Sequence, residues 1–419
     1  MSLLVKRNVF PGFVLDPAEP TRERADVRYR YEPDWRVSGV PLLIGAGLLL
    51  VSVVGWIVDP AQFFFSYLIG WMTCVTISLG ALFYVLIHHL THAHWGIVIR
   101  RIQEALIYGF PLLALLSIPL WFGLHDLFHW THDEVYEVGN PAFDPILAGK
   151  RDYLNVPFFA IRVVIYFTLW SVLAWKLYRL SIEQDVRADP EISVRQRKAS
   201  AWGVPVFALT VAFASYDLLM SVDPHWFSTI FGVYVFAGSA WSGAAATVLF
   251  ALMLQRGGAA RYAITTEHYH DLGKWIFAFT VFWAYIAFSQ YMLIWYGNIP
   301  EETIWYQHRL EHGWQVHSGI LLVAHFIIPF ILLLPRGTKR SRWFLSVMAV
   351  WVLVLHWFDL HWLAMPALHE HGGIHWLDVT CWLGLSGVYA SAVVYRLSRH
   401  SVIPQHDPRL ARSLAFENI

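Results

Sequence analysis

The chain has 419 residues, of which 57% are hydrophobic and only 14% are charged, and it carries no net charge. Soluble domains contain roughly 25% charged residues, so this composition excludes an ordinary soluble domain and places about half the chain in lipid. The absence of a net positive charge also argues against a nucleic-acid partner.

A polar, basic segment of residues 1–39 opens the chain and is predicted to form a loosely ordered tail. Ten apolar runs follow, most of them near the ~20 residues that a helix needs to cross a bilayer. The first five predicted spans are Val40–Val58, Ser66–Leu90, Ile102–Leu120, Pro157–Leu177 and Ala201–Met220. The second five are Thr229–Leu254, Leu272–Tyr296, Val316–Leu334, Trp343–Leu363 and Leu377–Tyr395. The sequence therefore predicts an all-α integral membrane protein.

The distribution of Lys and Arg predicts the orientation of these spans. The even-numbered connections and both tails carry nearly all of them, whereas the odd-numbered connections carry little beyond Lys150, Arg151 and Arg309. Because cytoplasmic loops are enriched in Lys and Arg, both termini are predicted to face the cytoplasm. An even number of spans agrees with this orientation.

A Val-Asp-Pro turn occurs twice, at Val58–Pro60 and Val222–Pro224, and each time it separates two spans. The two turns lie four spans apart and cross from the same side, which indicates a parallel duplication. Asp59 and Asp223 are predicted to cap the helices that follow, since Asp before a helix accepts backbone N–H bonds.

This repeat predicts two four-helix bundles with one helix flanking each end. The predicted units are a cytoplasmic tail, a first flanking helix with its turn, two bundles, and a last helix with a second cytoplasmic tail. Their boundaries are residues 1–39, 40–65, 66–222, 223–364 and 365–419.

Few ionisable groups lie inside the predicted spans, where such groups are costly and usually functional. Arg162 and Asp217 lie at similar depths near the outer ends of spans four and five, so they are predicted to form an ion pair. Two roles stay open for this pair. It can lock two neighbouring helices together, or it can carry protons at the mouth of a site.

Span nine carries His356, Asp359 and His361, and the spacing of His356 and Asp359 places both on one face of the helix. An acid beside an imidazole can fix its tautomer and suits proton handling near neutral pH. A buried polar seam is the alternative. His325 lies alone near the middle of span eight, where a hydrogen-bonded structural histidine is the usual interpretation.

The sequence predicts no metal site, catalytic residue or covalently bound cofactor in this chain. Its two cysteines, Cys74 and Cys381, cannot make a four-cysteine iron–sulfur site or a Cys-x-x-Cys-His haem attachment. His88 and His92 could share a metal by their spacing, but no nearby acid or cysteine completes a set. The loop between spans three and four is rich in His and acid in a manner typical of a solvated surface helix.

Three stretches of the second half resemble one known family. They are Ser221–Tyr234, His270–Lys274 and the region from Thr280 to Glu302. These stretches are similar to the NrfD/polysulfide-reductase-type membrane subunits of bacterial alternative complex III. The ending, with His406 and Phe416–Asn418, is similar to that of the ActF-type subunit. The resemblance covers nearly all of the spanning region.

The resemblance implies ten helices in two four-helix bundles in a bacterial inner membrane, as part of a quinol:electron-acceptor oxidoreductase. It implies that the iron–sulfur clusters and haem c lie on partner subunits, namely an iron–sulfur protein and haem c proteins. It also implies a sister NrfD-like subunit, surrounding lipid, and quinone or quinol as the small molecule that this chain would bind.

Four functions therefore stay open. The first is a membrane subunit that supports quinol oxidation and conducts protons along Arg162, Asp217, His325, His356, Asp359 and His361. The second is a scaffold without chemistry, and the third is a haem-bearing cytochrome subunit. The fourth is a transporter, against which the parallel repeat and the expected absence of interrupted spans both argue.

Overall fold

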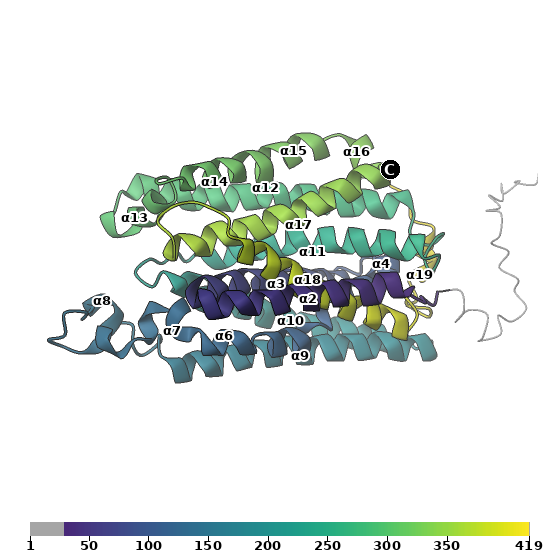
Figure 1. Ribbon diagram of the computed structural model, residues 1–419. Helices are drawn as coiled ribbons and strands as arrows, with labels where there is room; N and C mark the ends of the chain where they lie inside the picture. Colours follow the sequence, from purple (N-terminus) through teal and green to yellow (C-terminus); the bar gives the residue numbers. More distant parts are fainter. Residues whose placement is uncertain (1–28, 419) are drawn as a thin grey trace, which may run out of the picture.

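The structure is a computed structural model that describes residues 29–418. Ten helices in this part of the chain are long and apolar enough to cross a membrane, and no strand occurs among the same residues. The prediction of an all-α, multi-pass membrane protein is confirmed. Figure 1 shows the helices side by side along one direction, with α8 (Pro145–Ala148) and α13 (Pro300–His308) at one end. We call this the loop end, and the opposite end, which carries α19 (Leu410–Leu414), the terminal end.

The spanning helices are longer than the predicted apolar runs because polar residues extend them beyond the lipid. The first five are α2 (Trp35–Val58), α3 (Pro60–Leu90), α4 to α6 (Ile97–Ile107, Phe110–Leu116, Ile118–Phe122), α9 (Val156–Val186) and α10 (Pro190–Leu218). The second five are α11 (Phe231–Arg256), α12 (Thr266–Gly297), α14 to α15 (Trp314–Ile320, Ile328–Leu333), α17 (Arg342–Ala364) and α18 (Trp376–Arg399). Short elements are α7 (Leu124–Leu127), α16 (Arg336–Arg340), the π-helix η4 (Leu321–Ile327), and the 3-10 turns η1 (His129–Thr131), η2 (Asp133–Tyr136), η3 (Met220–Val222) and η5 (Met365–Ala367).

Helix α3 occupies the middle of the molecule and contacts α4, α10, α11, α17 and α18. Glycines make this close packing possible. A Cβ atom at Gly80 would lie 1.8 Å from the carbonyl oxygen of Ser239 on α11, and one at Gly70 would lie 2.9 Å from the backbone of Trp382 on α18. Small residues at such crossings let helix backbones approach closely where no water drives association.

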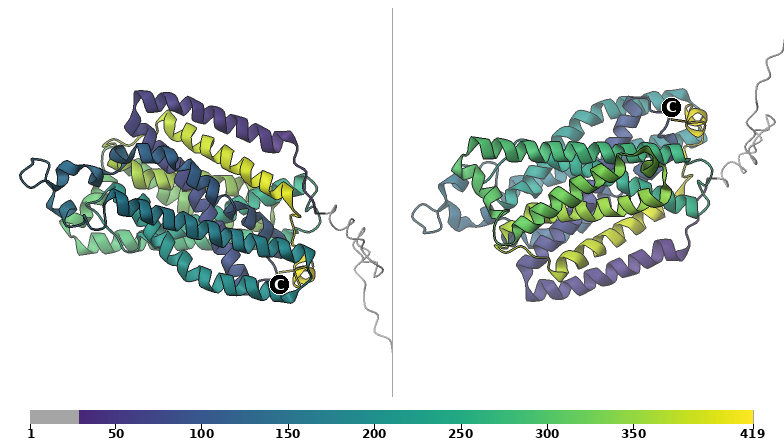
Figure 2. Two further views of the ribbon diagram at one scale, coloured as in Figure 1. Left: turned by 90° about the horizontal axis from the view of Figure 1, so that it is seen from below. Right: turned by 90° about the horizontal axis from the view of Figure 1, so that it is seen from above.

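The remaining helices surround α3 in two directions. Helix α9 contacts α10 and α4 on one side, and α11 contacts α12 and α17 on the other. Helices α2 and α18 lie side by side at one edge (Figure 2) and contact each other extensively. The predicted division into two four-helix bundles, with its domain boundaries, stays a prediction.

The third span is interrupted, so the expectation of uninterrupted spans is wrong for that span, whereas the eighth stays helical through a π-helical turn. The third span breaks twice, at residues 108–109 and at Ser117, because Pro111 and Pro119 cannot donate backbone hydrogen bonds. Side chains of α3 compensate at these breaks: the Trp71 indole and the Tyr67 hydroxyl each donate to a carbonyl oxygen of α5 at 2.8 Å. Neighbouring helices can satisfy freed carbonyl groups in this way inside a bilayer. In the eighth span, η4 separates α14 from α15.

The two Asp-Pro turns differ in their geometry. Asp59 accepts a bond from the backbone N–H of Gln62 at 3.2 Å, so it caps α3 as predicted. The capping prediction for Asp223 is wrong, because α11 begins only at Phe231 and its N-cap residue, Ile230, provides no side-chain bond. Trp226 is buried between these points and stacks on Trp305 at 4.2 Å, which keeps the intervening segment out of the helix.

The described chain begins and ends at the terminal end (Figure 1). Of the predicted tail, residues 1–28 lie outside the described residues, and α2 begins at Trp35 rather than Val40. The C-terminal segment is packed rather than loose, since Val402, Ile403 and Asp407 are all buried. Which side of the membrane this end faces stays a prediction.

Candidate functional site

Arg162 and Asp217 form a bidentate ion pair between α9 and α10 near the loop end. The Nε and Nη2 atoms of Arg162 donate to the two carboxylate oxygens of Asp217 at 2.8 and 2.9 Å. The Tyr166 hydroxyl donates to the same carboxylate at 2.6 Å, and Arg162 Nη1 donates to the Tyr153 carbonyl at 2.9 Å. Rings of Tyr153 and Phe158 cover the guanidinium at 3.8 and 4.4 Å. The predicted pairing is present, and the charges of both groups are engaged in it.

Asp359 on α17 has a different environment, because its carboxylate is held by neutral groups. The Tyr234 hydroxyl of α11 donates to Asp359 Oδ1 at 2.5 Å, and the Trp283 indole of α12 donates to Oδ2 at 3.2 Å. Asp359 is buried, and no Lys or Arg of the described residues forms an ion pair with it. Three helices therefore meet at one acid without a compensating positive charge.

His356 lies one turn before Asp359 but bonds to a different helix. Its Nε2 atom lies 2.7 Å from the Thr76 hydroxyl of α3, and its Nδ1 atom has no hydrogen-bond partner among the described residues. The expected pairing of His356 with Asp359 is therefore absent, because each side chain is drawn to a partner on another helix. Both side chains lie beside Gly238 of α11: a Cβ there would lie 3.0 Å from His356 Nδ1 and 4.0 Å from Asp359 Oδ2.

His325 of the π-helix η4 lies beside these groups, and we call His325, His356 and Asp359 the central cluster. Its imidazole is fully buried and is stacked between the indole rings of Trp241 and Trp283, with ring centroids 4.0 and 3.8 Å away. Neither ring nitrogen has a hydrogen-bond partner among residues 29–418, so the expected hydrogen-bonded structural histidine is not observed. Trp283 thus contacts His325 with its face and Asp359 with its N–H group. Single turns of π-helix inside α-helices frequently occur at functional sites.

His361 belongs to a separate polar group nearer the loop end. Its Nε2 atom lies 3.3 Å from Asp378 Oδ2 of α18, without hydrogen-bond geometry. Asp378 accepts bonds from Ser66 at 2.5 Å and Gln62 at 3.0 Å, both on α3, and from the backbone N–H of His375 at 2.7 Å. This group ties α17 and α18 to the start of α3.

The structure therefore divides the predicted path residues into three groups: Arg162 with Asp217, His325 with His356 and Asp359, and His361 with Asp378. Sequence reasoning missed Tyr234, Trp283, Thr76 and Asp378. The resemblance could have indicated Tyr234 and Trp283, which lie within the stretches that carry it. The rarity of acids inside spans could have indicated Asp378, which lies inside a predicted span.

The Pro224 turn is attached to the long loop before α9. His225 contacts the carboxylate of Asp144, and the Lys150 ammonium donates to the Pro224 carbonyl at 2.6 Å. Burial lowers the pKa of Lys150. Burial alone would raise the pKa of Asp144, but the bond from His225 and two backbone N–H bonds outweigh it and lower the pKa. The turn thus serves as an anchor for this loop.

A buried ionic cluster lies at the terminal end, where the sequence suggested only loop charges. Arg100 contacts Glu104 at 3.1 Å and Asp407 at 2.8 Å, while Arg101 contacts Glu104 at 3.1 Å and Asp185 at 2.9 Å. Both arginines are almost completely buried, because α4 begins at Ile97 and carries them into the helix packing. The cluster joins α4 and α9 to the C-terminal segment.

Asp407 holds this C-terminal segment in place. Burial alone would raise its pKa, but the positive charges of Arg100 and Arg409 outweigh burial and hold the pKa well below its ordinary value. Arg409 donates to Asp407 from both its backbone and its guanidinium at 2.9 to 3.1 Å. The carboxylate is therefore ionised at neutral pH and anchors the segment.

The histidines at the end of α3 do not form a common metal site. His88 and His89 are buried, whereas His92 lies in the turn after the helix, with φ of 51°, and contacts Arg197. No group of three or more His, Cys, Asp or Glu side chains suited to a metal occurs in the part of the chain that the structure describes.

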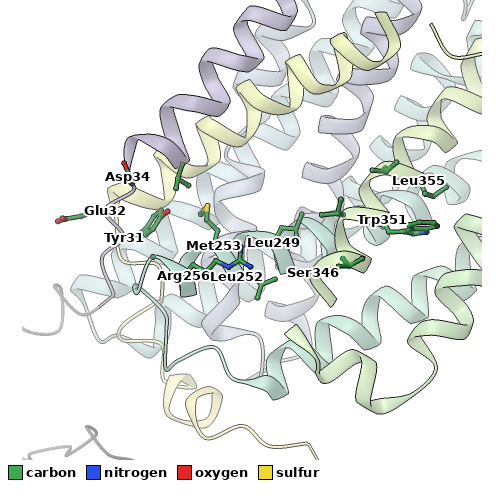
Figure 3. Close-up of a pocket in the computed structure, with 15 residues that line it drawn as sticks. Tyr31, Glu32, Asp34, Leu249, Leu252, Met253, Arg256, Ser346, Trp351 and Leu355 are labelled. Atoms are coloured by element: carbon green, nitrogen blue, oxygen red, sulfur yellow. The ribbon is translucent and has the colours of Figure 1, made fainter. Parts of the chain in front are cut away.

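A large groove opens at the terminal end between the start of α2, α11 and α17 (Figure 3). Its volume is about 910 Å³, with Tyr31 and Asp34 at one end and Trp351 and Leu355 at the other. None of the predicted path residues lines it. It ends beside Leu355, the neighbour of His356 in the sequence, so this opening approaches the central cluster along α17.

Comparison with protein-family models finds none that matches this chain. Comparison with curated protein sequences likewise finds no match.

Proposed function

We propose that the chain is an integral membrane subunit of a quinol:electron-acceptor oxidoreductase of the alternative complex III type. It supports quinol oxidation by a sister subunit, while an iron–sulfur protein and haem c proteins carry the electrons. The resemblance of Ser221–Tyr234, His270–Lys274 and Thr280–Glu302 supports this assignment. The distribution of Lys and Arg supports an orientation with the terminal end in the cytoplasm of a bacterial inner membrane.

Within this complex the central cluster conducts protons. The observation that carries this role is the environment of Asp359, which two neutral donors hold and no described cation balances. Such an acid can gain or lose a proton without breaking an ion pair. Asp217 cannot, because Arg162 occupies both of its oxygens. His356 has an unbonded Nδ1 atom and lies beside the same glycine, Gly238, as Asp359, so its imidazole is the second group of the cluster able to exchange a proton.

Replacing Asp359 by Asn in the reconstituted complex tests this role. The amide oxygen keeps an acceptor for the Tyr234 hydroxyl, and only the longer bond from Trp283 is lost, so we expect the fold to survive. In sealed vesicles, proton release per quinol oxidised should fall below that of the unmodified complex, while quinol binding is retained.

Asp217→Asn is the matched control, because it also neutralises one buried acid in the spanning region. It should reduce the yield of assembled complex but leave the proton-to-quinol ratio of the assembled fraction unchanged. A normal ratio in Asp359→Asn vesicles would remove the proton role from the central cluster.

A scaffold role is the second candidate, and the saturated ion pairs favour it. The Arg162–Asp217 pair and the terminal-end cluster both join helices without leaving a charge available for chemistry. A scaffold predicts that neutralising Asp359 and His356 together lowers assembly alone. A haem-bearing subunit is the remaining alternative, and a Soret band in the purified chain would support it.

A further inference from the structure

A second groove lies between α9 and α10, two neighbouring helices seen side by side in Figure 2. Its volume is about 550 Å³. Its walls are apolar and include Leu169, Val172 and Leu173 of α9 and Trp202, Gly203 and Val206 of α10. Val172 is 54% exposed and Trp202 is 80% exposed, so the groove opens on the outer surface of the molecule rather than into its core. In a spanning protein that surface faces lipid.

Three cationic side chains line the same groove: Lys176 of α9, and Arg195 and Lys198 of α10. Arg195 donates to Glu183 at 2.9 Å, so an acid already balances its charge. Lys176 and Lys198 are exposed and form no ion pair with any residue from 29 to 418. The groove therefore combines apolar walls with two unbalanced ammonium groups.

The two lysines lie at the depth of the lipid headgroups. Helices α9 and α10 have 31 and 29 residues, more than the ~20 that cross the hydrocarbon. Counted from the loop end, Lys176 lies 20 residues after Val156, and Lys198 lies 20 residues before Leu218. Both ammonium groups thus reach the same boundary, on facing helices. The exposed ring of Trp202 lies one turn deeper, where indoles favour the interface.

Small side chains create the space between the helices. Gly203 lies so close to Leu173 of α9 and Leu86 of α3 that a Cβ atom there would lie 3.0 and 2.8 Å from them. Ala199, one turn away, also lines the groove. The helices therefore pack closely at Gly203, and small side chains line the groove between this point and the lysines.

We propose that this groove binds one anionic phospholipid, with its phosphate between Lys176 and Lys198 and an acyl chain along the apolar wall. The chemistry of the site fits a phosphodiester headgroup joined to hydrocarbon, since basic pockets between spanning helices at this depth select anionic lipids. The bound lipid holds α9 and α10 together at the terminal end, as Arg162 and Asp217 hold them at the loop end. The inference requires only that the chain spans a membrane, and it is independent of the proposed enzyme complex.

Native mass spectrometry of the purified full-length chain tests the proposal. The delipidated protein is titrated with phosphatidylglycerol or with phosphatidylcholine of the same acyl chains. We expect one tight phosphatidylglycerol and no equivalent phosphatidylcholine. Each cation near the membrane surface contributes about a fivefold factor in affinity for anionic lipid, so Lys176→Gln with Lys198→Gln should weaken this binding about thirtyfold.

Two controls separate a built site from a diffuse surface charge. Replacing both lysines by Arg should retain the preference for phosphatidylglycerol. Arg179→Gln removes a cation at nearly the same depth of α9 that lines a different groove, and it should leave binding unchanged. Equal binding of the two lipids to the unmodified protein would overturn the proposal, and this result needs no variant to fold. An unaltered preference in the double Gln variant, or an equal loss in Arg179→Gln, would overturn it as well.

Discussion

Asp217→Asn tests whether the ion pair between α9 and α10 is a structural lock. The substitution preserves the shape of the side chain but leaves the buried Arg162 facing a neutral amide. Arg162 cannot easily turn toward solvent, because the Tyr153 carbonyl and two aromatic rings hold its guanidinium in place. The variant should therefore retain an uncompensated charge inside the helix pair.

The structure sets the expected size of the effect. Removing one partner of a buried ion pair costs about 3–5 kcal/mol. We expect about 3 kcal/mol, at the low end of that range, because Arg162 keeps its bond to Tyr153 and its ring contacts. Hydrogen bonds between spanning helices contribute ~0.6 kcal/mol on average and ~1.7 at most. The loss expected for a broken buried ion pair and the loss expected for an interhelical hydrogen bond do not overlap. Measuring the loss of stability therefore decides which of the two Arg162 and Asp217 form.

Unfolding in mixed micelles, titrated with a denaturing detergent, provides that measurement for Asp217→Asn, Arg162→Met and the double variant. The double variant should recover most of the stability lost by Asp217→Asn, since it leaves no charge unpaired. A loss below about 1.7 kcal/mol in Asp217→Asn would show an ordinary interhelical hydrogen bond. If the stability losses of the two single variants simply add up in the double variant, the ion pair is not a structural lock.

Three further perturbations test other parts of the structure. Asp407→Asn should release the C-terminal segment from Arg100 and make it more sensitive to protease at pH 7, and unchanged cleavage would contradict the anchor. Because the pKa of Asp407 is lowered in the folded protein, the stability that its carboxylate contributes is complete above about pH 4 and is lost as the pH falls further. The unmodified segment should therefore loosen only in acid. The Asn variant should lack this pH dependence. Asp59→Ala removes the cap of α3 and should lower the free energy of unfolding by about 1 kcal/mol, with Asp59→Asn close to the unmodified protein; equal stability of the Ala variant would argue against the cap. Asp378→Ala removes the acceptor of three donors, of which Ser66 and Gln62 are buried, and should cost about 2 kcal/mol in the same assay. A smaller loss would mean that water replaces the carboxylate.

The spans and the Arg162–Asp217 pair could be predicted from the sequence for the same physical reason. Hydrocarbon provides no hydrogen bonds to backbone or charged groups, so spans must be helical and apolar, and isolated charges at equal depth must meet. The helix positions agree with the apolar runs, and the two side chains are bonded to each other. Asp59 follows equally from the local rule for helix caps.

The central cluster could be predicted only in part. The spacing of His356 and Asp359 places them on one side of α17, but their partners come from other helices, which the spacing within one helix does not specify. The stacking of His325 between two indoles depends on the π-helical turn, for which the sequence gives no local signal. Asp223 is the opposite case, in which the local sequence predicts a helix cap that does not form. The helix begins later, at Phe231, because Trp226 is buried in the segment between them.

If the central cluster conducts protons, Asp359 must exchange a proton during turnover. Infrared difference spectroscopy of the reconstituted complex, started by addition of quinol, observes the carboxylic-acid carbonyl directly. We expect a band that changes with quinol oxidation, disappears in Asp359→Asn and persists in Asp217→Asn. A band that survives the replacement of Asp359, or one that disappears with Asp217 instead, would contradict it.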